Sequence, residues 1–257
     1  MSDWPFDPDD TSIFLKTGPE SALPMFEAEA DGLKELKSAN ALRVPEIIGS
    51  GIAAGQSFLA LERFSFDRPT TVTERSLGER LAQLHHHTKD RFGWFRDNTI
   101  GLTPQINTSC DDWIEFLREY RLGYQLRLAA ANGYAADVGE AGRSLLHRLP
   151  DFFAGYEPVA SLLHGDLWGG NWGSVSGEPV IFDPAVYYGD RESDIAMTML
   201  FGGFGRTFYE AYEASWPMAS GHERRIRLYQ LYHVLNHLNL FGRSYLGRAV
   251  GLLDELT

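Results

Sequence analysis

Residues 162–184 read LLHGDLWGGNWGSVSGEPVIFDP, and the rest of the chain is best understood from this stretch. Four residues separate Asp166 from Asn171, and a glycine-containing turn then leads to the apolar run 179–182, which ends on Asp183. The pattern predicts a loop that carries a carboxylate and an amide, followed by a strand that delivers a second carboxylate. An ordinary hairpin whose polar residues shape its turns is the simpler interpretation. The acid–amide spacing, the strand and the Asp-Pro ending together favour a functional site.

Three polar side chains in this order suit the transfer of a phosphoryl group. One carboxylate accepts the proton of the attacking hydroxyl, while an amide oxygen and a second carboxylate hold the magnesium ions that neutralise the phosphate oxygens. The spacing D-x-x-x-x-N is also that of a kinase catalytic loop. We therefore interpret Asp166 as the catalytic base and Asn171 and Asp183 as magnesium ligands. The predicted cofactors are ATP and Mg²⁺.

The composition is typical of a globular protein that works in water. The 257 residues, 44% hydrophobic and 23% charged, suffice for one large domain or two lobes. No apolar run reaches the roughly 18 residues of a membrane span, and the acidic start MSDWPFDPDD lacks a signal-peptide core, so we expect a cytoplasmic location. The single cysteine, Cys110, excludes an intrachain disulfide. A net charge of −12 argues against nucleic acid and anionic membrane as partners.

The region before the catalytic stretch begins with a strand and a helix. Residues 12–16 form a short apolar run that ends on Lys16, and residues 25–40 have a helical period that places Glu29 on the same face as Phe26. A carboxylate on a buried face needs a partner, and Lys16 is the obvious one. In a kinase such a pair orients the lysine toward the α- and β-phosphates of the nucleotide. The alternative is a solvated lysine and a glutamate at a helix end.

Two further strands are predicted at residues 45–48 and 57–64, around a glycine-rich turn at 49–55. The second of these strands runs directly into a polar segment, so its end is expected to be the hinge between two lobes. In that position, backbone groups of Glu62 and Phe64 would meet the edge of the adenine ring, and we assign both residues to nucleotide binding.

An α+β fold with two lobes follows from these elements. Residues 1–64 are the predicted nucleotide-binding lobe, made of a small sheet and one helix, and residues 65–257 are the predicted catalytic lobe, which is mainly helical. Residues 91–113 have no periodicity, so we expect an irregular loop of a kind that is often functional.

Histidines occur at two places in the predicted helices. Residues 85–87 are three adjacent histidines, which point about 100° apart on a helix and therefore do not converge on one metal ion. We expect His85 to be a core residue with satisfied hydrogen bonds. His233 and His237, with Asn236, lie in the helical region 222–248 and are likewise expected to be buried polar groups with partners.

Long segments of the chain resemble a known family. HGDLWGGNWG and PVIFDPAVYYGDRESDIAMTMLFGGF are similar to the fructosamine kinase (ketosamine-3-kinase) family, a relative of the aminoglycoside phosphotransferases with a protein-kinase-like fold. MFEAEADGL, FGWFRDNTIGLTPQINTSCDDW and LYQLYHVLNHLNLFGRSY resemble the same family at the same relative positions. The resemblance implies ATP-dependent phosphorylation of the sugar 3-hydroxyl of a ketosamine, an amine-linked sugar formed by glycation. Because the product decomposes and frees the amine, the implied role is deglycation.

The resemblance also implies a role for each residue that matches the family pattern. Lys16 and Glu29 would be the pair that orients the phosphates. Trp168, next to the base, would pack against the sugar, with plain core packing as the alternative. His164 and Asp194 would give structural support to the catalytic loop. The implied partner is a ketosamine, either a small molecule or linked to a protein, and the chain is expected to be a monomer or a weak dimer.

One departure from the family pattern lies near the start of the chain. Only fifteen residues precede Lys16, whereas relatives have about two more strands and a glycine-rich turn that covers the β- and γ-phosphates. We therefore expect a small lobe that is truncated before the lysine strand. Two other functions stay open: a phosphotransferase for an aminoglycoside or another hydroxyl substrate, and a catalytically impaired relative that only binds.

Overall fold

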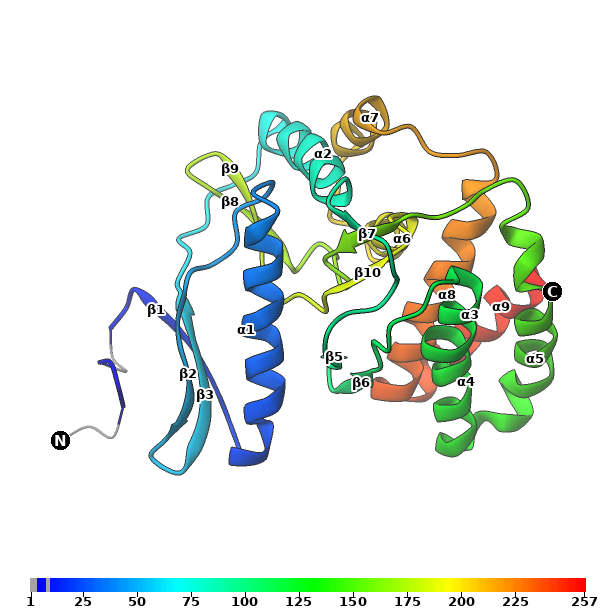
Figure 1. Ribbon diagram of the computed structural model, residues 1–257, viewed down its shortest axis with the longest axis horizontal. Helices are drawn as coiled ribbons and strands as arrows, with labels where there is room; N and C mark the ends of the chain where they lie inside the picture. Colours follow the sequence, from blue (N-terminus) through cyan, green and yellow to red (C-terminus); the bar gives the residue numbers. More distant parts are fainter. Residues whose placement is uncertain (1–3, 8–9) are drawn as a thin grey trace.

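The computed structural model, which describes residues 4–7 and 10–257, confirms a mixed α+β fold (Figure 1). Residues 1–3 and 8–9 of the predicted first lobe lie outside the described residues, and the division at residue 64 stays a prediction. The helices are α1 (Leu23–Ser38), α2 (Thr71–His85), α3 (Trp113–Phe116), α4 (Gly123–Ala129), α5 (Ala135–Phe152), α6 (Glu192–Leu200), α7 (Arg206–Ser215), α8 (His222–Phe241) and α9 (Leu246–Leu256). The strands are β1 (Ile13–Gly18), β2 (Ile47–Ala53), β3 (Gln56–Glu62), β4 (Thr88–Lys89), β5 (Asn98–Ile100), β6 (Thr103–Gln105), β7 (Ala160–Leu163), β8 (Trp172–Val175), β9 (Glu178–Ile181) and β10 (Tyr187–Gly189).

The N-terminal sheet is antiparallel, with the strand order β1-β3-β2. Lys16 lies opposite Leu59 in the register of β1 and β3. Helix α1 lies between this sheet and the remainder of the molecule (Figure 1), and it buries its apolar face, including Leu33 and Leu36, in the core. This position brings the helix that carries Glu29 beside the strand that carries Lys16.

The prediction of a glycine-rich turn over residues 49–55 is wrong about its length, because most of these residues belong to strand β2. Gly49 and Gly51 face the ring of Phe58, which would lie 3.8 Å and 3.4 Å from a Cβ at these positions. Their lack of a side chain makes room for an aromatic ring rather than for a turn. The turn itself is only Ala54-Gly55, both with positive φ (50° and 73°).

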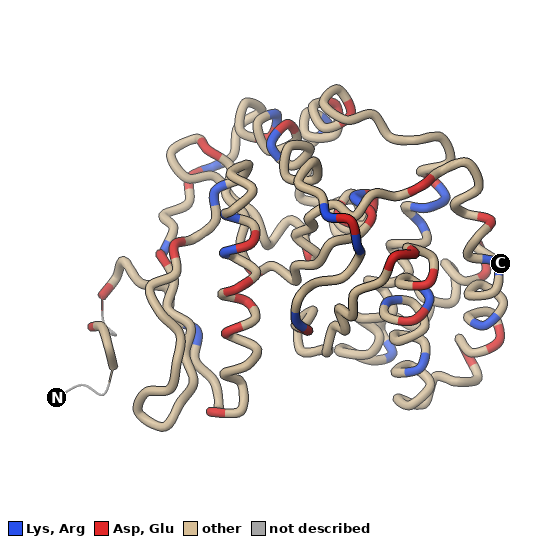
Figure 2. Tube along the Cα trace, in the orientation of Figure 1, with Lys and Arg blue, Asp and Glu red and all other residues tan. Residues whose placement is uncertain are grey.

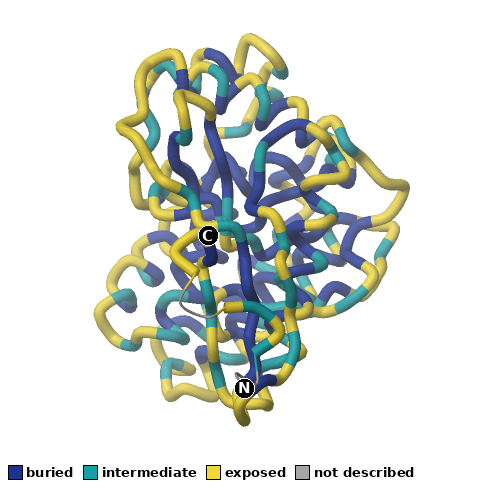
Figure 3. The backbone as a smooth tube through the Cα atoms, turned by 90° about the vertical axis from the view of Figure 1, so that its left-hand side faces the viewer, coloured by how far each residue is buried: buried dark blue, intermediate teal, exposed yellow. Residues whose placement is uncertain are grey.

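The larger, mainly helical part of the chain has a core centred on α8. This helix is buried along most of its length, and its side chains Leu231, Val234 and Leu235 are fully buried. Helices α2 and α7 approach closely, since a Cβ on Gly78 would lie 2.3 Å from the backbone oxygen of Phe208. Figure 3 shows the buried segments running through the middle of the molecule and the exposed ones around its periphery. None of the helices in the described part of the chain is long and apolar enough to cross a membrane.

The segment 91–113 is more ordered than the sequence predicted, because it contains the hairpin β5–β6. Side-chain amides stabilise the hairpin: Gln105 donates to Asn98 Oδ1 over 2.9 Å and to the Ala185 carbonyl over 3.0 Å. Asn107 donates to the same Asn98 oxygen over 2.9 Å. Amide contacts of this kind leave no hydrophobic periodicity, so the residue pattern did not indicate strands here. Asp112 caps α3, at the end of this segment.

The prediction for His85 is confirmed, since it is a core residue with partners. It accepts from Tyr212 over 2.8 Å and donates to Asp194 over 3.2 Å. Both contacts come from helices that are distant from His85 in the sequence, namely α7 and α6. The imidazole therefore joins three helices of the larger core.

Three polar residues of α8 were predicted to be buried with hydrogen-bond partners, and two of them have such partners. Asn236 has partners, because it donates to the Ile100 carbonyl and accepts from Gln125, and His237 lies 2.8 Å from the His233 carbonyl. His233 is buried, but neither of its ring nitrogens forms a hydrogen bond of good geometry within the described structure, so the expectation is wrong for it. The Ser193 backbone nearby raises the pKa of His233 but does not offset the effect of burial. Helix α8 packs against α6 here, and helices bond most of their backbone groups internally, which leaves few acceptors for a buried ring.

Candidate active site

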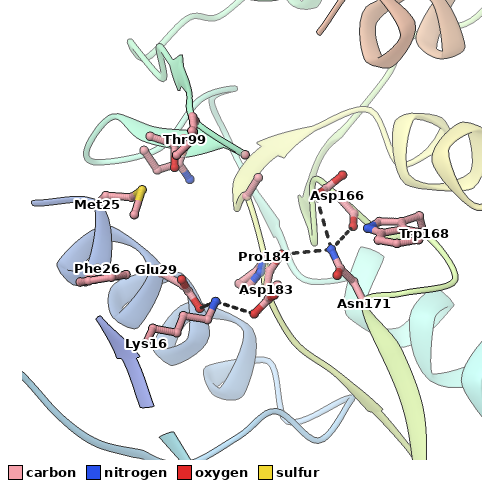
Figure 4. Close-up of a pocket in the computed structure, with 14 residues that line it drawn as sticks. Lys16, Met25, Phe26, Glu29, Thr99, Asp166, Trp168, Asn171, Asp183 and Pro184 are labelled. Carbon is pink, nitrogen blue, oxygen red and sulfur yellow. Dashed lines mark hydrogen bonds and ion pairs between the residues drawn. The ribbon is translucent and has the colours of Figure 1, made fainter. Parts of the chain in front are cut away.

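A cavity of about 330 Å³ opens between α1, the β5–β6 hairpin and the catalytic stretch (Figure 4). It brings together six of the residues singled out from the sequence. Its lining is Lys16, Met25, Phe26, Glu29, Asn98, Thr99, Gly101, Leu102, Asp166, Trp168, Asn171, Asp183, Pro184 and Ala185. Residues more than 160 positions apart therefore meet around one space.

Asp194 holds the loop that precedes Asp166. Its two carboxylate oxygens accept the backbone N–H groups of His164, over 2.8 Å, and Gly165, over 2.9 Å. His85 donates to the same carboxylate and fixes it further. Gly165 has φ of 83°, and a Cβ there would lie 2.0 Å from the Ala185 oxygen, so only glycine fits this turn.

His164 ties the catalytic loop to the strand that leads to Asp183. The Asp166 N–H donates to its Nδ1 over 3.3 Å, so its Nε2 carries the proton and donates to the Phe182 carbonyl over 3.0 Å. Burial lowers the pKa of His164 and keeps the ring neutral. This neutral tautomer suits the structural role that the sequence predicted for it.

Asp166 lies at the wall of the cavity with its carboxylate largely shielded from water. Burial raises its pKa to about 7, and the negative charges of Asp194 and Asp183 act in the same direction. The Asn171 amide opposes them: its Nδ2 donates to the Asp166 carbonyl over 2.9 Å and lies 3.4 Å from Oδ2. A carboxyl whose pKa is near neutrality is suited to accept and release a proton.

Asn171 and Asp183 lie close enough to share a ligand. The Asn171 Nδ2 points toward the Asp183 carbonyl, 3.4 Å away, and toward Asp166, so the amide oxygen remains as an acceptor. Asp183 is at φ 56°, a conformation that Asp tolerates, and its side chain is 45% exposed. Carboxylate and amide oxygens are the donors that Mg²⁺ prefers.

The described residues contain no group of three or more His, Cys, Asp or Glu side chains arranged to hold a metal. A magnesium site in a phosphotransferase has few protein ligands, because phosphate oxygens and water supply the others. The pair Asn171 and Asp183 therefore fits such an ion, and no larger protein cage is needed.

Lys16 reaches both sides of the cavity (Figure 4). Its Nζ lies 2.7 Å from Glu29 Oε1 and 2.6 Å from Asp183 Oδ1. Burial alone would lower the pKa of Lys16, but the two carboxylates outweigh it and raise that pKa. Burial raises the pKa of Glu29 despite the charge of Lys16. The predicted lysine–glutamate pair is thus formed, with Asp183 as a further partner.

A second cavity of about 320 Å³ adjoins the first at Asp183. Its lining is largely apolar and includes three phenylalanines that the sequence did not single out; the lining residues are Phe14, Pro45, Leu61, Glu62, Arg63, Phe64, Phe66, Phe182 and Asp183. The predicted hinge residues Glu62 and Phe64 are both part of it. The Glu62 N–H donates to the Glu46 carbonyl over 2.8 Å, and its side chain pairs with Arg43 over 2.5 Å. Glu62 could therefore offer a ligand its carbonyl oxygen but not its N–H.

Trp168 borders the cavity on the side away from Lys16 and is 41% exposed. Its ring lies over Gly170, where a Cβ would be 2.3 Å away, and it meets Phe201 edge to face at 6.5 Å. Plain core packing does not account for a tryptophan with this exposure.

Sequence reasoning missed the residues that the β5–β6 hairpin adds to the cavity, namely Asn98, Thr99, Gly101 and Leu102. The lack of periodicity in residues 91–113 indicated an irregular loop of a functional kind, but it could not say which residues face the cavity. That information depends on how the hairpin packs against α1, which is a long-range contact.

The fold is kinase-like, and the polar side chains gathered in the cavity are of the kinds that phosphoryl transfer requires. The streptomycin–ATP complex of APH(2″)-IIa matches 96% of this chain and 86% of its own length with a TM-score of 0.65, and at 13% identity this likeness shows the fold alone. A crystal structure from Haemophilus somnus, titled "putative fructosamine-3-kinase", matches 95% of this chain and 83% of its own length with a TM-score of 0.88 and 32% identity.

Sequence comparison identifies the family. Residues 2–257 match the fructosamine kinase family, and the chain belongs to it. The chain is 44% identical over 245 residues to a "probable ketoamine kinase" of Synechocystis sp., covering 94% of this chain and 82% of that protein. It is 42% identical over 248 residues to the chloroplastic protein-ribulosamine 3-kinase of Arabidopsis thaliana, covering 95% and 76%. The chain is therefore a kinase of this family, as its sequence motifs predicted.

Proposed function

We propose that this protein uses ATP and Mg²⁺ to phosphorylate the sugar 3-hydroxyl of ketosamines such as fructosamines or ribulosamines. The role of this reaction would be deglycation. The observation that carries the proposal is geometric: Asp166, Trp168, Asn171, Asp183 and Lys16 line one cavity, which is large enough for a sugar. Relatives named as ketoamine and ribulosamine kinases share 40–44% of the sequence and support this substrate class.

The sugar hydroxyl would approach the Asp166 carboxylate, which accepts its proton as the oxygen attacks the γ-phosphorus of ATP. Lys16, held by Glu29, would contact the α- and β-phosphates and hold the chain of phosphates in line with the hydroxyl. The present contact from Lys16 to Asp183 would be exchanged for contacts to phosphate oxygens.

Magnesium fits at Asn171 and Asp183, where it would neutralise the phosphate oxygens and favour departure of ADP. The adenine would occupy the apolar cavity between Phe14 and Phe182, next to the Phe64 backbone. An aromatic slot of this kind suits a flat base, which stacks well on phenylalanine rings.

Trp168 is the proposed sugar-binding residue, and the aromatic residues beyond it would face the amine side of the substrate. The Phe201 ring meets Trp168, and the His237 ring lies 4.7 Å from Phe201. The ketosamine nitrogen is a protonated secondary amine, and aromatic faces attract such cations. A sugar that lacks the amine would lose this contact between the cation and the aromatic rings.

The experiment is an ADP-release assay of the purified chain with matched acceptors: fructosyl-lysine, ribulosyl-lysine, free fructose with free lysine, and an aminoglycoside. We expect turnover with the two ketosamines only, a requirement for Mg²⁺, and a phosphate that NMR places on the 3-hydroxyl. Turnover with the aminoglycoside alone would replace the proposed substrate, and nucleotide binding without any turnover would identify a binding relative. In Trp168→Ala the KM for the ketosamine should rise while the KM for ATP stays constant.

A further inference from the structure

Helix α1 carries Glu29 on one side. On its other side, acidic residues of the helix itself bind neighbouring segments of the chain. Figure 2 shows acidic residues at several turns of α1. Asp31 and Glu35 lie one turn apart and thus on the same face, whereas Glu29 faces Lys16. Asp31 pairs with Arg96 over 2.7 Å, and Arg96 also donates to the Pro24 carbonyl at the start of the helix over 3.3 Å.

Glu35 connects α1 to two other segments of the chain, residues 89–94 and the strand that contains Tyr188. It accepts hydrogen bonds from Tyr188 Oη over 2.7 Å, Lys89 Nζ over 2.9 Å and Trp94 Nε1 over 3.3 Å. Burial would raise the pKa of Glu35, but these donors outweigh it and lower that pKa. Burial and the Glu35 carboxylate raise the pKa of Tyr188, so its hydroxyl stays a donor. The contact is a charge-assisted cluster rather than one surface ion pair.

The same face of α1 touches the chain that continues beyond Asp183. Tyr188 is five residues after Asp183, and Val186 between them lies 3.2 Å from the position of a Cβ on Gly32. Lys16 connects Glu29 back to Asp183. The contacts therefore form a closed ring: α1 binds Lys16 at one side and the segment 183–188 at the other.

We propose that Glu35 is a positioning residue for the nucleotide phosphates, because it fixes the rotation and distance of α1 relative to the segment that carries Asp183. A helix that turned or moved by a fraction of a turn would withdraw Glu29 from Lys16. Lys16 would then remain paired with Asp183 alone and would lose the contact that turns it toward the α- and β-phosphates. The predicted effect on the KM for MgATP rests on the proposed ATP-dependent function. The predicted effect on MgATP binding does not depend on which sugar is phosphorylated.

The first test compares Glu35→Gln with Glu27→Gln. Both variants remove one negative charge from α1, but Glu27 is exposed and forms none of the contacts of Glu35. We expect the KM for MgATP to rise about tenfold in Glu35→Gln and to stay unchanged in Glu27→Gln. The KM for the ketosamine should not change, because Trp168 and Asp166 lie on the other side of the cavity.

The second test asks whether Glu35 acts through Glu29. In a Glu29→Gln background, Glu35→Gln should raise the KM for MgATP by less than twofold, since the pair it positions is already lost. Should Glu35→Gln fold poorly, Tyr188→Phe replaces it: this variant removes one donor, leaves the carboxylate in place, and should give a smaller effect in the same direction. Equal effects of Glu35→Gln in both backgrounds would overturn the proposal.

A merely structural role has a different signature. It would lower the melting temperature and the active fraction, so that kcat falls while both KM values stay constant, and that result would also overturn the proposal. Calorimetric titration with MgATP separates this inference from the proposed function. If no ketosamine is phosphorylated but Glu35→Gln still weakens nucleotide binding about tenfold relative to Glu27→Gln, the substrate is wrong and the positioning role stands.

Discussion

The two sides of the active-site cavity are held by different kinds of contact. On the catalytic side, Asp194 is almost wholly buried and binds the backbone of His164 and Gly165. On the nucleotide side, Lys16 and Glu29 are partly exposed side chains joined by an ion pair. Backbone hydrogen bonds to a buried carboxylate fix a loop in one geometry. An ion pair between long side chains is held less tightly, because its geometry changes with the position of the helix that carries one partner. The catalytic side should therefore be the more rigid of the two.

Asp166→Asn should have the largest effect. Asparagine keeps the contact with Asn171 but cannot accept the proton of the hydroxyl, so kcat should fall about 10³-fold, within the range for loss of a general base. MgATP binding should stay within about twofold of the wild type, because Lys16 and Asp183 are untouched. Single-turnover kinetics with calorimetric titration measures both quantities. A variant that keeps a tenth of the wild-type rate would contradict the assignment of Asp166 as the base.

Asp194→Asn tests the rigid side directly. An amide can accept from only one of the two N–H groups of His164 and Gly165, and its NH₂ group would oppose the other donor. We expect the free energy of unfolding to fall by about 3 kcal/mol, because buried donors lose a charged acceptor. Chemical denaturation measures this. The exposed acid Glu210 gives a matched control, and an Asp194→Asn protein as stable as Glu210→Gln would disprove the bracing role.

Lys16→Met tests the side held by ion pairs, and its effect should be on catalysis rather than on folding. Methionine keeps much of the apolar length but loses the charge that would meet the phosphates, so kcat/KM for ATP should fall about 100-fold. The free energy of unfolding should change by less than about 1 kcal/mol, as is usual for partly exposed pairs. A large loss of stability would show that the two sides do not differ in this way.

The contrast also explains which parts of the site could be predicted from the sequence. Asp166, Asn171 and Asp183 lie within eighteen residues, so their spacing alone indicated one site, and the structure brings them together. Glu29 required a helical period, and its partner Lys16 lies only thirteen residues before it. Local spacing and periodicity are enough for such cases.

The remaining features depend on contacts between distant segments. The three donors to Glu35 lie 54 to 153 residues after it, and nothing near Glu35 in the sequence marks them. The β5–β6 hairpin is stabilised by amide contacts, so hydrophobic patterning did not reveal it. The predicted truncation before Lys16 and the roles of Glu62 and Phe64 at the hinge stay predictions.

His233 gives the smallest expected effect and differs from the satisfied groups around Asp194, because its buried ring has no hydrogen-bond partner in the described structure. Burial lowers its pKa from 6.5 to about 3, and the nearby His237 acts in the same direction. Below pH 6.5 the unfolded chain binds a proton at this histidine that the folded chain excludes, so stability falls as the pH decreases toward 3. Between about pH 7 and pH 5 this histidine should cost about 2 kcal/mol of unfolding free energy.

The measurement is chemical denaturation of the wild type and of His233→Phe at about pH 7 and pH 5. Phenylalanine keeps a planar ring of similar size and does not titrate, so the variant should lose about 2 kcal/mol less than the wild type over this range. Other buried histidines, such as His85 and His164, contribute equally to both proteins and cancel in the difference. Equal losses would mean that the imidazole finds a partner or a proton in the folded state, and His233 would then resemble the satisfied buried groups around Asp194 rather than contrast with them.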